Sequence, residues 1–137
     1  MKINLNKDIF GALEVDEAFF KGIYRPVEIA GDGLTDDEIA QTIKHPIGTP
    51  RLKELAKGCT TVLIVTDDNT RNTPLKRILT TVLQELKVGG ISDSNIQFLI
   101  GLGTHRAMTR AEIEIKFGFE IARKFTIHNH QWDQPGA

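Results

Sequence analysis

The chain has 137 residues and a formal net charge of -1, from 17 Lys and Arg residues against 18 Asp and Glu residues. A chain of this length buries one hydrophobic core, so we expect a single domain over residues 1–137. The hydrophobic fraction of 40% and the charged fraction of 26% are typical of a globular protein. The balanced charge argues against nucleic acid or an anionic membrane as a partner.

The cysteine content and the N-terminus bear on the compartment. Cys59 is the single cysteine, which excludes an internal disulfide, a C-x-x-C motif and a cysteine-based zinc finger. The first eight residues are polar where a signal peptide needs an apolar segment, and no apolar run approaches the roughly 20 residues of a membrane span. We therefore expect a cytoplasmic protein.

The first third of the chain alternates between short apolar patches and helix signals. Apolar patches at 3–5, 9–15 and 24–29 are broken by Gly and Pro, which predicts a small β-rich extension. Thr35 and Glu38 form a capping box that predicts a helix over about 36–44. For the next helix, ending at Gly58, the pattern predicts Thr49 as N-cap and Pro50 as the first helical residue.

From residue 60 the chain alternates strands and helices. The β-branched run 60–66 predicts a strand buried on both faces. Helical periodicity follows from Pro74 to Gly89, then a second apolar strand at 96–102, two short helices at 109–117 and 119–124, and a third strand at 125–128. This order predicts an α/β fold, specifically a Rossmann-like three-layer βαβαβ parallel sheet.

Ligands of such sheets bind at the carboxyl ends of the strands, where the sequence places three polar loops. In the first loop, 67–74, Arg71 precedes a helix N-terminus, a combination suited to a carboxylate or phosphate. The alternative is a structural turn in which Thr73 caps the helix and Arg71 pairs with Asp67 or Asp68.

The second loop, 101–109, contains His105 among glycines, and histidine is the residue type suited to proton transfer near neutral pH. Arg106 stands where the dinucleotide fingerprint G-x-G-x-x-G requires its last glycine, so a nicotinamide dinucleotide is not expected. The position of His105 after a buried strand favours a role in proton transfer.

The third loop, 128–133, adds two histidines. His128 and His130, together with His105 and Asp68, offer mixed nitrogen and oxygen ligands for a divalent metal, with His130 a weak candidate. Residues two apart on a strand face opposite sides, so at most one of the two histidines is expected to face the site. Trp132 is expected to be a packing or interface residue.

Taken together, these stretches resemble the N-terminal domain of the nickel-pincer-dependent lactate racemase family. The matching segments are Pro46–Pro50 with Leu52 and Leu55, Asp68–Arg71 with Thr73 and Pro74, Gly101–Thr109 with Glu112, and Asn129–His130. The two central motifs occur in the family's order, each after a predicted strand and before a helix. The resemblance extends over most of the chain from about residue 30.

The resemblance implies an isomerase, a racemase or epimerase of 2-hydroxy acids that uses a nickel-pincer pyridinium mononucleotide. It implies hydride transfer from the substrate to that cofactor, with His105 in proton transfer and Asp68 supporting it. Arg71 and Arg106 are implied for the anionic substrate. The resemblance also implies that four residues contact the cofactor: Thr70, Thr73, Gly103 and Thr104.

Family members carry a second region with the cofactor-anchoring lysine and a nickel ligand, so we interpret this chain as a fragment that is inactive alone. The partners expected are a small 2-hydroxy acid and the missing C-terminal domain. An exposed sheet edge or cleft surface is expected to be covered by that domain or by a second copy. The alternative is an anion- or nucleotide-binding α/β module without catalysis.

Overall fold

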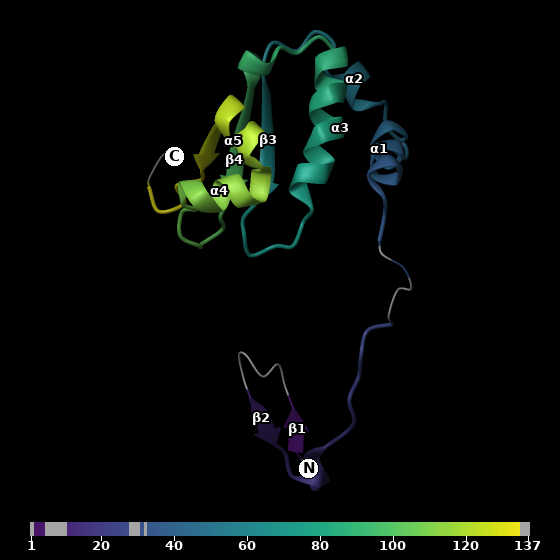
Figure 1. Cartoon of the computed structure of the whole chain (residues 1–137), viewed down its shortest axis with the longest axis vertical. Helices are drawn as coiled ribbons and strands as arrows, with labels where there is room; N and C mark the ends of the chain where they lie inside the picture. The colour runs from purple at the N-terminus through teal and green to yellow at the C-terminus, as the bar shows by residue number, and fades with distance from the viewer. Residues whose placement is uncertain (1, 5–10, 28–30, 32, 135–137) are drawn as a thin grey trace. The chain divides into compact units, whose positions relative to one another are not determined.

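The computed structural model describes residues 2–4, 11–27, 31 and 33–134 of the chain (Figure 1). The chain divides into two compact units, Met1–Asp32 and Gly33–Ala137. In the first unit, β1 (Lys2–Asn4) pairs antiparallel with β2 (Ala12–Glu14), and a short 3-10 helix η1 (Glu17–Phe19) follows. This unit is the predicted β-rich extension. Of the predicted patches, residues 5, 9–10 and 28–29 lie outside the described residues, and 24–27 form no strand.

The second unit begins with two short helices, α1 (Asp36–Lys44) and α2 (Leu52–Leu55). The predicted capping box of α1 is confirmed, since Thr35 N donates to Glu38 Oε2 at 2.7 Å and Glu38 N donates to Thr35 Oγ1 at 3.2 Å. The predicted start of α2 is wrong. The N-cap is Arg51, while the Thr49 hydroxyl donates to the Pro50 carbonyl at 2.9 Å instead of capping.

A three-stranded parallel sheet forms the centre of this unit, in the order β3-β4-β5. Its strands are β3 (Val62–Asp67), β4 (Ile96–Gly101) and β5 (Thr126–Asn129). The connections contain α3 (Leu75–Val88), the 3-10 helix η2 (Asp93–Asn95), α4 (Arg110–Phe117) and α5 (Phe119–Lys124). The predicted α/β class with a parallel βαβαβ sheet is confirmed.

The hydrophobic core lies between this sheet and its helices. Phe98 on β4 is fully buried and makes edge-to-face contacts with Phe117 and Phe125, each with ring centroids 5.5 Å apart. Leu79 and Leu86 of α3 are also almost fully buried and belong to the same hydrophobic cluster. None of the helices in the described ranges has both the length and the hydrophobicity needed to cross a membrane.

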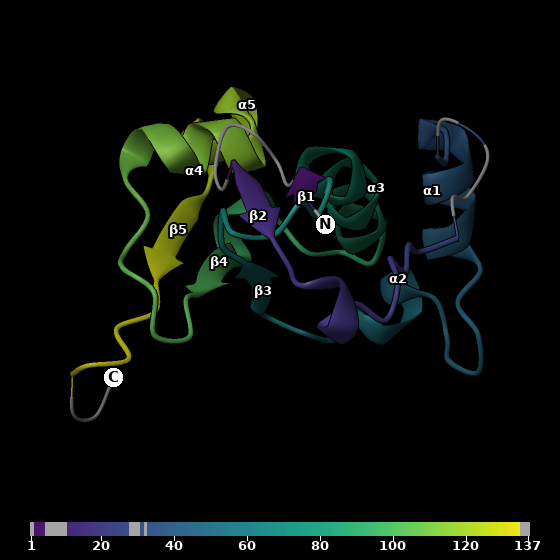
Figure 2. The same cartoon turned by 90° about the horizontal axis from the view of Figure 1, so that it is seen from below.

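Among the described residues of the second unit, the sheet is covered on one face only, which corrects the predicted three layers. Leu63 and Val65 of β3 are 56% and 65% exposed, whereas Ile64 between them packs against the core. Right-handed crossovers along a sheet of order β3-β4-β5 bring every connecting helix to the same face. Figure 2 shows α3, α4 and α5 on one side of the strands. Burial of strand 60–66 on both faces is therefore wrong for the described part of the chain.

Candidate functional site

The three predicted loops meet at one edge of the sheet. Because the strands are parallel, the ends of β3, β4 and β5 lie side by side, with Asp67 paired to Gly101 and Ile100 paired to Asn129. The loops that follow each strand therefore converge, as the fold class predicts for a ligand site.

The closest contact between two loops is a histidine–aspartate pair. His105 Nδ1 lies 2.5 Å from Asp68 Oδ2, and Asp68 is only 4% exposed. The other oxygen, Oδ1, accepts from Thr70 Oγ1 at 2.6 Å and from Thr70 N at 3.1 Å. The Thr70 hydroxyl, followed by His105, lowers the pKa of Asp68 to about 2, so the carboxylate is ionised at neutral pH.

The ionised carboxylate of Asp68 determines which nitrogen of the His105 imidazole carries the proton. Since Asp68 only accepts hydrogen bonds, we assign the neutral imidazole proton to Nδ1 of His105, which leaves Nε2 with a lone pair. The His105 side chain is 55% exposed, and Nε2 has no hydrogen-bond partner among the described residues. This geometry suits a general base or acid acting on a ligand outside the pair.

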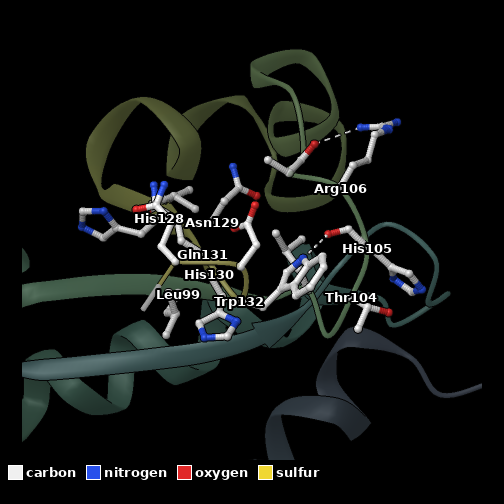
Figure 3. A pocket seen from close by; sticks show the side chains of 14 residues that line it. Leu99, Thr104, His105, Arg106, His128, Asn129, His130, Gln131 and Trp132 are labelled. Atoms are coloured by element: carbon white, nitrogen blue, oxygen red, sulfur yellow. Dashed lines mark hydrogen bonds between the residues drawn. The ribbon is translucent and has the colours of Figure 1, made fainter. Parts of the chain in front are cut away.

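A cavity of about 940 Å³ adjoins this pair, lined by the loops after β4 and β5 (Figure 3). Thr104, His105 and His130 line it, and Trp132 Nε1 donates to the His105 carbonyl at 3.3 Å. Trp132 is 51% exposed, so it borders the cavity and is not a core residue. The volume falls within the roughly 300–1,000 Å³ of small-molecule sites.

The first loop is held by a lysine that the sequence did not single out. Lys116 of α4 is buried, and its Nζ lies 2.7 Å from Asp67 Oδ1 and 3.0 Å from the carbonyl oxygen of Arg71. Asp67 also accepts from the Thr73 hydroxyl, so Thr73 does not cap α3. The Arg71 side chain is exposed, and no ion pair with Asp67 or Asp68 forms.

The second predicted substrate arginine is already paired. Arg106 donates two hydrogen bonds to Glu112, at 2.6 and 2.9 Å, and Asn69 Nδ2 donates to the same carboxylate at 3.1 Å. Arg106, followed by the backbone of Thr109, lowers the pKa of Glu112 to about 2. Glu112 thus joins the first two loops. The spacing of Thr109 and Glu112 predicts only a capping role for Glu112, because a capping box carries no information about residue 69.

The third loop is fixed through Asn129. Its Oδ1 accepts from Met108 N at 2.9 Å, and its Nδ2 donates to Met108 O at 3.0 Å. Both His128 and His130 line the cavity, and His128 Nε2 also contacts Gln97 Oε1 at 3.2 Å.

The mixed metal site suggested by these histidines does not form. Within the ranges the structure describes, no three His, Cys, Asp or Glu side chains are grouped closely enough to hold a metal ion. The reason is geometric, because the Asp68 carboxylate is engaged by Thr70 and His105 and the ring of His128 is turned to Gln97.

Comparison with known proteins gives one family. Residues 8–137 match the family model of the lactate racemase N-terminal domain. A lactate racemase from Thermoanaerobacterium thermosaccharolyticum is 34% identical over 96 residues, covering 69% of this chain and 22% of that protein. The lactate racemase of Lactiplantibacillus plantarum is 32% identical over 98 residues, covering 71% of this chain and 23% of that protein.

Solved structures agree in fold. The lactate racemase apoprotein from Thermoanaerobacterium thermosaccharolyticum superposes with a TM-score of 0.68 at 28% identity, covering 95% of this chain and 30% of that one. A protein from Thermotoga maritima gives a TM-score of 0.57 at 27% identity, covering 79% of this chain and 24% of that one. The chain therefore covers between 22% and 30% of the length of the lactate racemases that it matches. With a family model that matches nearly its whole length, the chain belongs to the lactate racemase N-terminal domain family.

Proposed function

We propose that this chain supplies one half of the active site of a 2-hydroxy acid racemase or epimerase, in which His105 transfers the hydroxyl proton of the substrate. The observation that carries the proposal is the contact of 2.5 Å between His105 Nδ1 and the buried carboxylate of Asp68, beside a cavity. Membership of the lactate racemase N-terminal domain family supports it.

The proton chemistry follows from the pair. Nε2 of His105 accepts the hydroxyl proton, and the ionised Asp68 stabilises the imidazolium that forms. When the α-carbon is reduced again, His105 returns the proton to the oxygen. Histidine suits both steps because its two protonation states are similar in free energy near neutral pH.

The substrate carboxylate needs a cation. The exposed Arg71 side chain has no ion-pair partner among the described residues and lies in the loop that also carries Asp68, which supports its role in anion binding. Arg106 is paired with Glu112, so its binding of substrate would require exchange of that partner.

Removal of the α-hydrogen requires an acceptor. A nickel-pincer pyridinium mononucleotide, when bound, would supply that acceptor, taking the hydrogen as a hydride. Within the described part no three metal-ligating side chains are grouped, so these residues would not hold the nickel by themselves. Thr104 and the backbone at Gly103 line or adjoin the cavity, whereas the hydroxyls of Thr70 and Thr73 already donate to carboxylates.

The experiment is a stereoisomer assay on the active protein, with its remaining domains and cofactor. The unsubstituted protein should convert one lactate enantiomer to an equal mixture, and His105→Ala should lower kcat by at least about 1,000-fold, in line with the loss of an essential acid–base group. His45→Ala, which removes the exposed histidine at the end of α1 whose Nδ1 contacts the Gln41 carbonyl at 2.9 Å, is the matched control and should stay within about threefold. Full activity of His105→Ala would refute the proton-transfer role.

A further inference from the structure

Lys116 is a buried cation that the chemistry above does not use. Its side chain is 5% exposed, and its Nζ contacts two groups of the first loop, Asp67 Oδ1 at 2.7 Å and the Arg71 carbonyl at 3.0 Å. The carbonyl it contacts lies 45 residues earlier in the chain. Burying an ammonium group is costly unless it is paired and hydrogen-bonded, and here both partners belong to one loop.

The two partners of Lys116 stand on either side of Asp68, which contacts His105, and of Thr70, which donates to Asp68. Asp67 precedes Asp68, and Arg71 follows Thr70, so one ammonium group joins the two ends of this turn. Within the turn, Thr70 N and Arg71 N donate back to Asp68, to Oδ1 at 3.1 Å and to the carbonyl at 3.3 Å. Burial raises the pKa of Asp67, but its contacts with Lys116 and Thr73 lower the pKa by more than burial raises it. The pKa of Asp67 therefore lies below its ordinary value, and this carboxylate is also ionised.

Glu112 holds the same loop from one turn earlier on α4. Glu112 and Lys116 are four residues apart and therefore lie on one face of the helix. Glu112 accepts from Asn69 at 3.1 Å, while Lys116 contacts Asp67 and Arg71. The β3–α3 loop is thus fixed at three points by a helix outside it.

We propose that Lys116 is a positioning residue for substrate binding: by holding Asp67 and the Arg71 backbone, it keeps the Arg71 guanidinium where the carboxylate of the hydroxy acid binds. The inference rests on the proposed function for the identity of the ligand. Lys116 does not touch substrate and takes no part in proton transfer.

A positioning role and a purely structural role predict different measurements. If Lys116 only stabilises the fold, Lys116→Met lowers the amount of folded protein and leaves KM unchanged. If it positions Arg71, the folded protein binds substrate poorly while His105 remains competent, so KM rises and kcat changes little.

The test compares Lys116→Met with Lys124→Met in two measurements. Lys124 makes an ion pair of 2.6 Å with Asp93, but its side chain is 58% exposed and belongs to α5. The first measurement is amide hydrogen exchange in the 137-residue chain, at Thr70 and Arg71 relative to Phe98 in the core. We expect exchange at the two loop amides to accelerate at least tenfold in Lys116→Met and to stay within twofold in Lys124→Met.

The second measurement is steady-state kinetics of the active protein with lactate as the probe. We expect KM to rise at least tenfold in Lys116→Met with kcat within threefold, and both constants to stay within twofold in Lys124→Met. If Lys116→Met does not fold, Lys116→Gln, which keeps a neutral donor, is measured with the same expectation.

Unchanged exchange at Thr70 and Arg71, or an unchanged KM in the folded variant, would overturn the positioning role. Failure of the unsubstituted protein to interconvert lactate enantiomers would overturn the proposed function instead. In that case the exchange measurement still decides whether Lys116 fixes the loop.

Discussion

The histidine–aspartate pair depends on two residues that lie 37 positions apart in the chain. The sequence indicated both, His105 from its place among glycines after a strand and Asp68 from its place at the end of another. Residue spacing alone could not establish that Asp68 orients the imidazole, because it does not encode the direction of a loop side chain. The structure assigns that contact to Asp68.

Replacing Asp68 with asparagine keeps the size of the side chain and removes its charge. We expect Asp68→Asn to lower kcat by at least about 100-fold, because an amide in place of the carboxylate no longer stabilises the imidazolium or fixes the tautomer. Kinetics of the active protein measure this effect. Asp93→Asn removes an aspartate of similar size from a surface ion pair and should leave kcat unchanged; comparable losses in the two variants would contradict the assignment.

The low pKa of Asp68 links the site to acid stability. The folded pKa, about 2, lies below the roughly 3.9 of an unfolded chain, so the folded state binds fewer protons between these values. The stabilisation is complete above about pH 4 and is lost as the pH falls through the folded value. We expect a ¹³C NMR titration of the Asp68 carboxyl to give its midpoint near pH 2, and Thr70→Val to raise it. A midpoint near 4 in the unsubstituted chain would contradict the hydrogen bonds described for Asp68.

At the scale of elements, the sequence predicted the start of a helix well where all the residues that form its cap are close together in the chain. The capping boxes at Thr35 and Thr109 form within four residues, and both exist as predicted. The predicted start of α2 is wrong because the N-cap, Arg51, is held by a distant residue. Its guanidinium donates to Glu85, 34 residues away, at 2.6 Å. The prediction that the first strand is buried on both faces is wrong for a similar reason. The number of helix layers depends on the order of the strands in the sheet, which is not a local property of the sequence.

The contact between α2 and α3 requires a glycine. A Cβ at Gly89 would lie 2.7 Å from the Lys53 carbonyl oxygen and from Ala56 Cβ. Alanine favours helical backbone by up to about 1 kcal/mol, but overpacking against backbone typically costs about 1–3 kcal/mol. We therefore expect Gly89→Ala to lower the free energy of unfolding by about 1–2 kcal/mol in urea denaturation. The exposed neighbour Val88, changed to Ala, should shift it by less than about 0.5 kcal/mol. Equal stability of Gly89→Ala and the unsubstituted chain would contradict this packing.

At the scale of the molecule, the chain forms a sheet with one covered face and loops that meet at one edge. The strand-helix order predicted the parallel sheet and its functional edge, because right-handed crossovers leave few alternatives. Leu63 and Val65 project from the uncovered face of β3. The cover expected over an exposed sheet edge or the cleft surface, by the C-terminal domain or by a second copy, stays a prediction.

The uncovered face should tolerate polar substitution in this chain. We expect Leu63→Thr and Val65→Thr to change the free energy of unfolding by less than about 0.5 kcal/mol, because neither side chain is buried. Phe98→Ala, on the covered face of β4, should cost about 3–5 kcal/mol. Urea denaturation of the 137-residue chain measures all three. A loss above about 2 kcal/mol for Leu63→Thr would show that a second layer covers this face.

We propose that His105 removes the hydroxyl proton while the α-hydrogen moves as a hydride. Racemisation of lactate by the active protein in D₂O distinguishes this route from removal of the α-hydrogen as a proton, with the α-carbon of the product analysed by mass spectrometry. We expect an equal mixture of enantiomers without deuterium at the α-carbon, since the same hydride returns. One deuterium at the α-carbon for each inversion would contradict it, because it would mean that a base removes the α-hydrogen as a proton.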